Sequence, residues 1–275
     1  MPPAGEHFPG SRAGGRRGGA ERGPKRKTTM ITKADAAMIR SLGDKRARTE
    51  LGLFVAEGEK LVSELPGSGF RVRRLLVRED SAVAGGFGVE AERVTAREME
   101  RISHLKTPQG ALALVEIPRR RLPDAPGREL TLALDGVQDP GNLGTILRLA
   151  DWFGIRDVLC SPQTADCFNP KVVQATMGAI LRVRVHYCDL PRVLSGAGVP
   201  VYGTFLDGEN IYGAGLGPSG IVAMGNEGNG ITPGVAAAVT RRLYIPPYPP
   251  GRPSSESLNV AVATAIVCSE FRRRM

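Results

Sequence analysis

The residues best suited to chemistry lie in three separated segments of the C-terminal half of the chain, residues 132–154, 221–231 and 243–271. Each segment joins an apolar, strand-like run to a turn that is rich in Gly, Asn and Ser and carries a few polar side chains. Placed side by side, such turns would make a pocket of backbone amides and small polar groups, which suits a small polar ligand. The pattern therefore indicates an enzyme.

Five polar side chains in these turns are the candidates for a catalytic role: Asn142, Arg148, Glu227, Ser257 and Asn259. Taken singly, each also has a structural explanation. Asn142 is placed to cap the helix that begins there, Arg148 to lie on a helix surface, and Glu227 to be solvated in its turn. Ser257 and Asn259 are placed to cap the last helix. All five in this order and spacing are better explained by a functional site.

Several familiar sites are absent from the sequence. No G-x-G-x-x-G follows a first strand, and no P-loop, H-E-x-x-H or G-x-S-x-G is present. The three histidines are isolated, and the four cysteines show no C-x-x-C spacing, which argues against structural zinc and against a disulfide scaffold. We therefore expect no bound metal, and reduced, mostly buried thiols in a cytoplasmic protein.

The elements that must position these turns alternate between short apolar strands and helices. We expect strands at residues 130–134, 158–160, 183–186, 199–205, 221–224 and 242–245, and helices at residues 143–153, 170–181, 233–239 and 257–272. This alternation is typical of an α/β domain with a mostly parallel, doubly wound sheet. Ligands of such sheets bind beyond the carboxyl ends of the strands. All three turns follow strands, so we expect them at that one edge.

The rest of the chain divides by composition. Residues 29–118 are expected to form a smaller α/β domain, with strands at 53–56, 75–77 and 111–117 and helices after Thr32, over 59–65 and after Thr95, where Thr95 and Glu98 make a capping-box pattern. Residues 119–128 combine prolines and charge with no apolar periodicity, which predicts a linker. Residues 129–275 then form the domain that carries the three turns.

The net charge of +9 is concentrated at the N-terminus. Residues 1–27 contain seven Lys and Arg against two Glu and almost no apolar side chains, so we expect residues 1–28 to be a disordered basic tail. Such a tail either neutralises phosphates of an RNA or is a solvated extension. No apolar run approaches the ~20 residues that a membrane span needs, and no signal-peptide core is present.

The three turns resemble the three motifs of a known family. Asp139-Pro-Gly-Asn142-x-Gly144 followed by Arg148 resembles the first motif, Gly225-Asn-Glu227-Gly228 the second, and Ile245-Pro246 followed by Ser257-Leu-Asn259-Val the third motif of the SpoU/TrmH-type RNA 2′-O-ribose methyltransferases, the SPOUT class. The resemblance covers about residues 130–273. The N-terminal α/β region resembles the small RNA-binding domain that precedes the catalytic domain in many members.

The resemblance implies more than the periodicity does. It implies a trefoil-knotted, mostly parallel sheet with a smaller N-terminal α/β RNA-binding domain, and a homodimer with active sites at its interface. It implies S-adenosylmethionine as cofactor, held by Gly203, Thr204, Gly225, Ile245 and Leu258. The five polar residues of the turns then occupy the positions that build the catalytic site.

These residue types suit transfer of a methyl group to a ribose. A 2′-hydroxyl is a poor nucleophile until its proton is removed or shared, whereas a sulfonium needs little activation, so positioning supplies much of the rate. Arg148, whose guanidinium is a poor base, is assigned to the neighbouring phosphate. Glu227 would orient Asn142 or Arg148, and Asn259 and Ser257 would hold the hydroxyl and the end of the cofactor.

One departure from the family pattern and several alternatives remain. Residues 247–256 form a longer, more Pro-rich loop than usual, which leaves the local cofactor contacts and the substrate open. Ribosomal RNA is favoured as substrate, because the N-terminal domain resembles those that recognise structured RNA. The alternatives are a tRNA 2′-O-methyltransferase and a non-catalytic RNA-binding assembly factor on the same scaffold. In all three cases we expect RNA as the partner, with no membrane and no metal.

Overall fold

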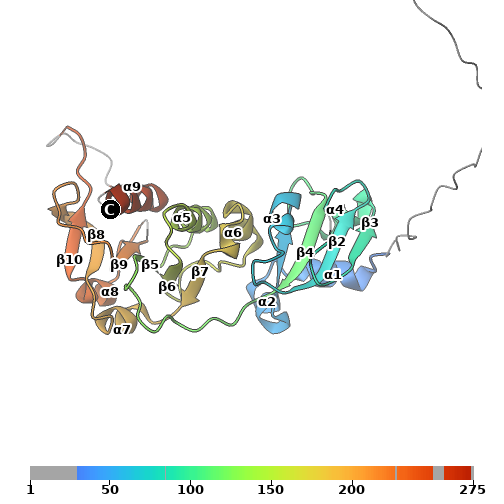
Figure 1. Ribbon diagram of the computed structural model, residues 1–275, viewed down its shortest axis with the longest axis horizontal. Helices are drawn as coiled ribbons and strands as arrows, with labels where there is room; N and C mark the ends of the chain where they lie inside the picture. Colours follow the sequence, from blue (N-terminus) through green and yellow to red (C-terminus); the bar gives the residue numbers. More distant parts are fainter. Residues whose placement is uncertain (1–29, 84, 227, 250–256, 274–275) are drawn as a thin grey trace, which may run out of the picture.

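The structure, a computed structural model, describes residues 30–83, 85–226, 228–249 and 257–273, which form two α/β units side by side along the long axis of the molecule (Figure 1). The basic tail expected at residues 1–28 lies outside the described residues, as does most of the Pro-rich loop. No helix among the described residues is long and apolar enough to span a membrane.

The N-terminal unit is a four-stranded sheet flanked by helices. Its elements are α1 (Lys33–Ser41), α2 (Lys45–Leu51), β1 (Leu53–Glu57), α3 (Glu59–Ser63), β2 (Val72–Arg78), β3 (Ala91–Val94), α4 (Ala96–Ile102) and β4 (Ala111–Glu116). The strand order is β1-β4-β2-β3, with β4 antiparallel to both neighbours and β3 parallel to β2. Helices α1 and α4 pack against each other and close one core through Ile39, Leu42, Met99 and Ile102.

Local signals explain where these helices begin. Thr32 and Asp35 form a capping box at α1, and Thr95 and Glu98 form the predicted one at α4. The sequence analysis did not predict α2 and β3. Helix α2 has only seven residues, and its sequence KRARTEL presents one buried side chain, Arg48, so it lacks the apolar periodicity on which the prediction depended.

The C-terminal unit is a six-stranded, entirely parallel sheet with helices on both faces (Figure 1). Its elements are β5 (Thr131–Asp135), α5 (Pro140–Trp152), β6 (Asp157–Cys160), α6 (Pro170–Ala175), the 3₁₀ helix η1 (Ala179–Leu181), β7 (Arg184–Tyr187), α7 (Leu190–Ser195), β8 (Val201–Asn210), β9 (Ile221–Gly225), α8 (Pro233–Ala238), β10 (Arg241–Tyr244) and α9 (Val260–Arg273). The strand order is β10-β8-β9-β5-β6-β7. Helices α5, α6 and α9 cover one face and α7 and α8 the other, which confirms the predicted doubly wound arrangement.

One predicted helix is interrupted. The expected helix over 170–181 stops at Ala175 and resumes as a 3₁₀ turn at Ala179. Met177 and Gly178 between them have φ values of 50° and 95°, which an α-helix does not allow. A Cβ at position 178 would lie 2.6 Å from a carboxylate oxygen of Glu64 in the N-terminal unit. The break therefore makes room for the neighbouring unit, which local sequence could not reveal.

The thiols are unpaired and largely inaccessible. Cys160, Cys167 and Cys268 are buried, Cys188 is half-buried, and none forms a disulfide. Burial raises the pKa of Cys167 and of Cys268 to about 12, so both stay protonated at neutral pH. These thiols are packing residues rather than nucleophiles.

Candidate active site

The three turns meet at the carboxyl edge of the parallel sheet. Strand β5 ends at Asp135, β9 at Gly225 and β10 at Tyr244, and the loops that follow carry the first, second and third motifs. β5 pairs directly with β9, with Asp135 opposite Gly225, so the first two loops leave the sheet side by side. The predicted gathering of the turns at one edge follows from the parallel sheet.

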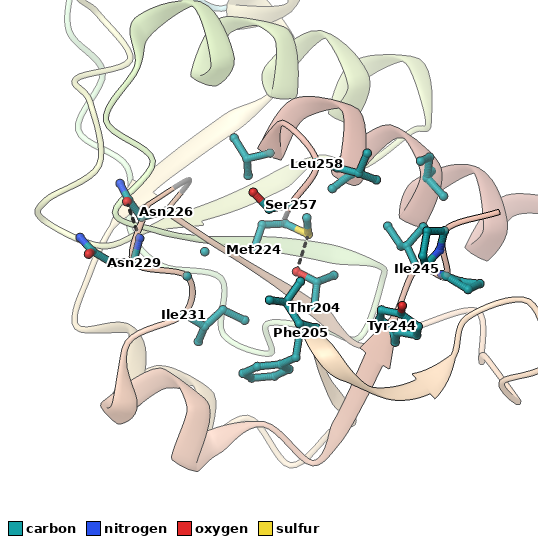
Figure 2. A pocket seen from close by; sticks show the side chains of 18 of the residues that line it. Thr204, Phe205, Met224, Asn226, Asn229, Ile231, Tyr244, Ile245, Ser257 and Leu258 are labelled. Carbon is teal, nitrogen blue, oxygen red and sulfur yellow. Dashed lines mark hydrogen bonds between the residues drawn. The ribbon is translucent and has the colours of Figure 1, made fainter. Parts of the chain in front are cut away.

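A cavity of about 710 Å³ opens at this edge, within the range typical of sites for small molecules (Figure 2). Its walls come from four segments: the end of β8 with the residues after it, the loop after β9, the segment after β10, and the start of α9. Thr204, Gly225, Ile245 and Leu258, four of the five predicted cofactor contacts, line the cavity. Gly203 does not line it, and a Cβ there would lie 2.7 Å from the ring of Phe205, so this glycine makes room for a wall residue.

Gly225 permits the tight return of the loop after β9. A Cβ at this position would lie 2.2 Å from the carbonyl carbon of Gly230 and 2.4 Å from the backbone nitrogen of Ile231. No side chain can be accommodated at such distances, so the backbone of Gly230 lies directly against the end of the strand. The result is a loop whose small residues leave the adjoining cavity open.

Asn226 fixes this loop and ties it to the first motif. Its Oδ1 accepts hydrogen bonds from the backbone N–H groups of Gly228 and Asn229 at 2.9 and 3.1 Å. Its Nδ2 donates to the carbonyl of Gly136, directly after β5, at 2.8 Å. In Figure 2 Asn226 and Asn229 lie together at one end of the cavity. The sequence analysis did not select Asn226, although an Asn in a Gly-rich turn is a recognised signal for such backbone bonding.

Asp135, which was not singled out from the sequence either, binds the C-terminal end of the same loop. This aspartate is buried at the end of β5 and its Oδ2 accepts a hydrogen bond from the backbone N–H of Thr232 at 2.7 Å. A buried carboxylate needs such partners. In the sequence this aspartate ends the apolar run Leu-Ala-Leu-Asp. A carboxylate at the end of a buried strand needs a hydrogen-bond partner, and this is the signal that could have identified it.

Asn142 and Asn259 meet beside the cavity. The Asn259 Nδ2 donates to the Asn142 Oδ1 at 3.0 Å, which joins the first and third motifs across 117 positions of sequence. The alternative that Asn142 caps its own helix is wrong, because α5 is capped by Asp139, whose Oδ1 accepts from the Asn142 backbone N–H at 2.7 Å. Asn259 does cap α9, since its Oδ1 accepts from the backbone N–H of Ala261 at 2.9 Å.

The other three polar candidates are placed differently. Ser257 lines the cavity, next to Leu258 (Figure 2). Arg148 lies on α5, six residues after Asn142, with an exposed side chain that makes no hydrogen bond or ion pair within the described part of the chain. Glu227 lies outside the described residues. The structure thus joins Asn142 to Asn259, puts Ser257 in the cavity wall, and leaves Arg148 exposed on the same helix as Asn142.

The cavity suits an adenosyl group joined to an amino acid. Ile231, Ile245 and Leu258 supply apolar surface for a flat ring, while the Gly-rich loop after β9 presents backbone polar groups at close range. Glycines at positions 225, 228 and 230 line the cavity without adding side chains to its wall. The residues present therefore fit S-adenosylmethionine. The described residues contain no group of three side chains placed to bind a metal.

Comparison with known proteins agrees with this geometry. Residues 129–269 match the SpoU rRNA Methylase family, and residues 37–113 match the MRM3-like substrate binding domain. The chain is 33% identical over 239 residues to the 23S rRNA (guanosine(2553)-2′-O)-methyltransferase RlmP of Bacillus subtilis, covering 85% of this chain and 94% of that protein.

Solved structures give the same answer. A protein of the TrmH family from Porphyromonas gingivalis superposes with a TM-score of 0.82 at 44% identity, covering 90% of this chain and all of that one. An AdoMet-bound rRNA methyltransferase of Sinorhizobium meliloti superposes with a TM-score of 0.79 at 31% identity, covering 91% and 98%. With its motifs gathered at one edge of the parallel sheet and relatives that match over nearly the whole chain, this protein belongs to the SpoU rRNA methylase family.

Proposed function

We propose that the protein transfers a methyl group from S-adenosylmethionine to the 2′-hydroxyl of a ribose in RNA, with ribosomal RNA as the substrate. The observation that carries the proposal is a cavity lined by residues of the second and third motifs, with the first motif joined to the third beside it by the bond from Asn259 to Asn142. The name of the Bacillus subtilis relative specifies 2′-O-methylation of 23S rRNA, and the Sinorhizobium meliloti relative was solved with AdoMet bound, which supports both the substrate class and the cofactor.

In this proposal the cofactor occupies the cavity. Thr204, Gly225, Ile245 and Leu258 contact it, and Gly203 keeps the wall residue beside it in place. When bound, S-adenosylmethionine supplies an electrophilic methyl group on a sulfonium that is already a good leaving group. The protein therefore needs to orient the acceptor and exclude competing water rather than activate the donor.

The polar residues act on the acceptor. The hydrogen bond between Asn142 and Asn259 fixes both side chains, so the pair is held in a set position beside the ribose hydroxyl. Ser257, in the cavity wall, holds the cofactor end. Arg148 binds the phosphate next to the target ribose. Glu227 orients Asn142 or Arg148.

The proposal extends to the organisation of the protein. Residues 29–118 bind the RNA, 119–128 link the domains, and 129–275 form the methyltransferase domain, while the basic tail at 1–28 adds sequence-independent attraction to phosphates. The family resemblance adds a trefoil knot in the second domain, a homodimer that completes two active sites, and a cytoplasmic location. Analytical ultracentrifugation of the full chain tests the dimer.

Methyl transfer from labelled S-adenosylmethionine to purified rRNA and tRNA lacking the modification tests the function. A 2′-O-methyl nucleoside gained in rRNA, identified by nucleoside mass spectrometry, is the expected result. A 2′-O-methyl nucleoside gained only in tRNA would support the proposed reaction and show that tRNA is the substrate. Binding of RNA without cofactor binding or transfer would favour the assembly factor.

The role of Arg148 is tested by its replacement with Ala. We expect at least 100-fold slower transfer with unchanged affinity for the cofactor, because Arg148 is exposed and is not among the residues that line the cavity. The exposed Arg156, outside the motif, provides the matched control as Arg156→Ala. Full activity of the Arg148→Ala variant would show that this arginine has no role in methyl transfer.

A further inference from the structure

A buried ion pair joins the two domains. Arg48 of α2 is only 2% exposed, and its Nε and Nη2 donate to the Asp166 Oδ2 at 3.0 and 2.6 Å. The remaining Nη1 donates to the Leu42 carbonyl at 2.7 Å, so the guanidinium is held from both sides. Arg48 lies within the segment that matches a substrate binding domain, and Asp166 within the methylase segment. This ion pair therefore connects the segment that matches a substrate binding domain to the segment that matches the methylase family.

The carboxylate partner organises the turn before α6. The Asp166 Oδ1 accepts from the backbone N–H of Phe168 at 3.0 Å, and the ring of Phe168 lies 4.7 Å from that of Phe54 in β1. The same turn ends at Asn169, whose side chain caps α6. One carboxylate thus binds the N-terminal domain with one oxygen and shapes the start of a catalytic-domain helix with the other.

Two routes connect this turn to the catalytic residues. Along the first, the backbone N–H of Ala165 donates to the carbonyl of Val137 at 2.9 Å, in the loop that leads to Asn142. Along the second, α6 packs on α5 at Gly144, where a Cβ would lie 2.4 Å from the Cβ of Ala175. That contact lies between Asn142 and Arg148 on α5. Both routes begin beside Asp166 and end at the first motif.

We propose that Arg48 and Asp166 are positioning residues for methyl transfer: their ion pair sets the loop and helix that carry Asn142 and Arg148 relative to the RNA held by the N-terminal domain. The inference rests on the proposed function. A buried ion pair contributes little net stability compared with apolar packing, because desolvation offsets its Coulomb attraction. Its strength is directional: two donors of the guanidinium reach Asp166 across the boundary, and the third fixes the guanidinium to Leu42 within the N-terminal domain.

A second polar contact between the domains is more exposed. Arg182 bonds Glu64 at 2.7 Å and Asp151 at 2.9 Å, but its side chain is 49% exposed. Solvent weakens such a pair. The Arg182 contact holds α5 at Asp151, at the far end of the helix from Asn142, so it provides a comparison for an interdomain contact that is distant from the loop at residues 136–142.

The test compares Asp166→Asn with wild type in the full-length protein. This substitution keeps an acceptor for the Phe168 N–H while it removes the charge that pairs with Arg48. Arg48→Gln tests the other partner. The matched controls are Arg46→Gln, which alters an exposed pair within α2, and Arg182→Gln. The readouts are single-turnover methyl transfer at saturating RNA, S-adenosylmethionine affinity, and amide hydrogen exchange of residues 136–142.

We expect Asp166→Asn and Arg48→Gln to slow transfer at least 10-fold with cofactor affinity changed less than twofold, and to raise exchange in residues 136–142 but not in 221–226. Both controls should remain within twofold of wild type. Folded variants with wild-type transfer and exchange would overturn the inference. If the wild-type protein transfers no methyl group, the proposed function fails, and the exchange data still decide whether the ion pair controls the first-motif loop.

Discussion

At the scale of single residues, the backbone and the side chain of Asn142 make separate contacts. The backbone N–H donates to Asp139 at the start of α5, whereas the side chain bonds Asn259. A substitution that removes the side chain therefore leaves the helix cap in place. The side chain is partly exposed and the position is not in the apolar core.

Replacing Asn142 with Ala should lower methyl transfer about 100-fold or more, the range for loss of a residue that positions or activates a reacting group. The free energy of unfolding should change by less than about 0.5 kcal/mol. Asp139→Ala is the control and should cost about 1 kcal/mol through loss of the cap. The measurements are rapid-quench methyl transfer and urea unfolding of both variants. Equal losses of stability in the two variants would contradict the division of roles.

At the scale of elements, the close packing of α5 on α6 determines where the first motif lies. Gly144 is the point of contact, because a Cβ there would lie 2.4 Å from that of Ala175 and 3.1 Å from the Val172 carbonyl oxygen. An exposed Gly→Ala change within a helix normally stabilises it. Here the clash with Ala175 makes the same change destabilising.

Gly144→Ala should destabilise the protein by about 1–3 kcal/mol through overpacking. It should also slow transfer, since α5 must move away from α6. The double variant Gly144→Ala/Ala175→Gly removes the clashing methyl group and should recover part of both losses. Thermal unfolding and transfer rates check this. A single variant as stable as Thr145→Ala, an exposed change one position away, would show that the contact is looser than described.

The capping box of α4 makes a prediction about pH. Backbone hydrogen bonding from Thr95 lowers the pKa of Glu98, helped by a further bond from the Ile31 N–H at 3.0 Å. A carboxyl whose pKa is lower in the folded protein contributes stability above its unfolded pKa and loses it as pH falls through the folded value. Glu98→Gln should therefore be destabilising at pH 7, by an amount that shrinks below about pH 4. Urea unfolding at pH 7 and at pH 3 to 4 measures both differences; a pH-independent difference would be evidence against the linkage.

At the scale of the whole molecule, one apolar core runs through both domains. The cluster that contains Leu132, Leu143 and Phe271 of the methylase domain also contains Phe54 and Val77 of the N-terminal domain. Phe54 is fully buried and its ring contacts Phe168 across the boundary. Continuous packing of this kind couples the unfolding of the two units.

Differential scanning calorimetry should therefore show one cooperative transition. Phe54→Ala should cost about 3–5 kcal/mol and lower the midpoint of that single transition. Hydrogen exchange would then increase in both sheets. Two separate calorimetric peaks, with only the earlier one moved by the substitution, would show that the domains unfold independently.

Local signals predicted most of the elements. The capping boxes, the Asn169–Pro170 start of α6 and the apolar strands depend on neighbouring residues, so they can be found in the sequence. The predicted last helix began three residues early, at Ser257 rather than Val260, because Asn259 forms its cap. Helix α7 was not predicted, since its six residues are too few to show a period.

The sequence by itself determined the parallel sheet, the edge at which a ligand binds and the family, because strand patterns and the three motifs are local and occur in a fixed order. The tertiary structure alone decided which polar groups meet. The bonds Asn259 to Asn142, Asn226 to Gly136 and Arg48 to Asp166 span 117, 90 and 118 positions, and no local pattern encodes such pairs. They exist because the fold brings elements that are distant in sequence together, and a polar group that is withdrawn from water there needs a partner.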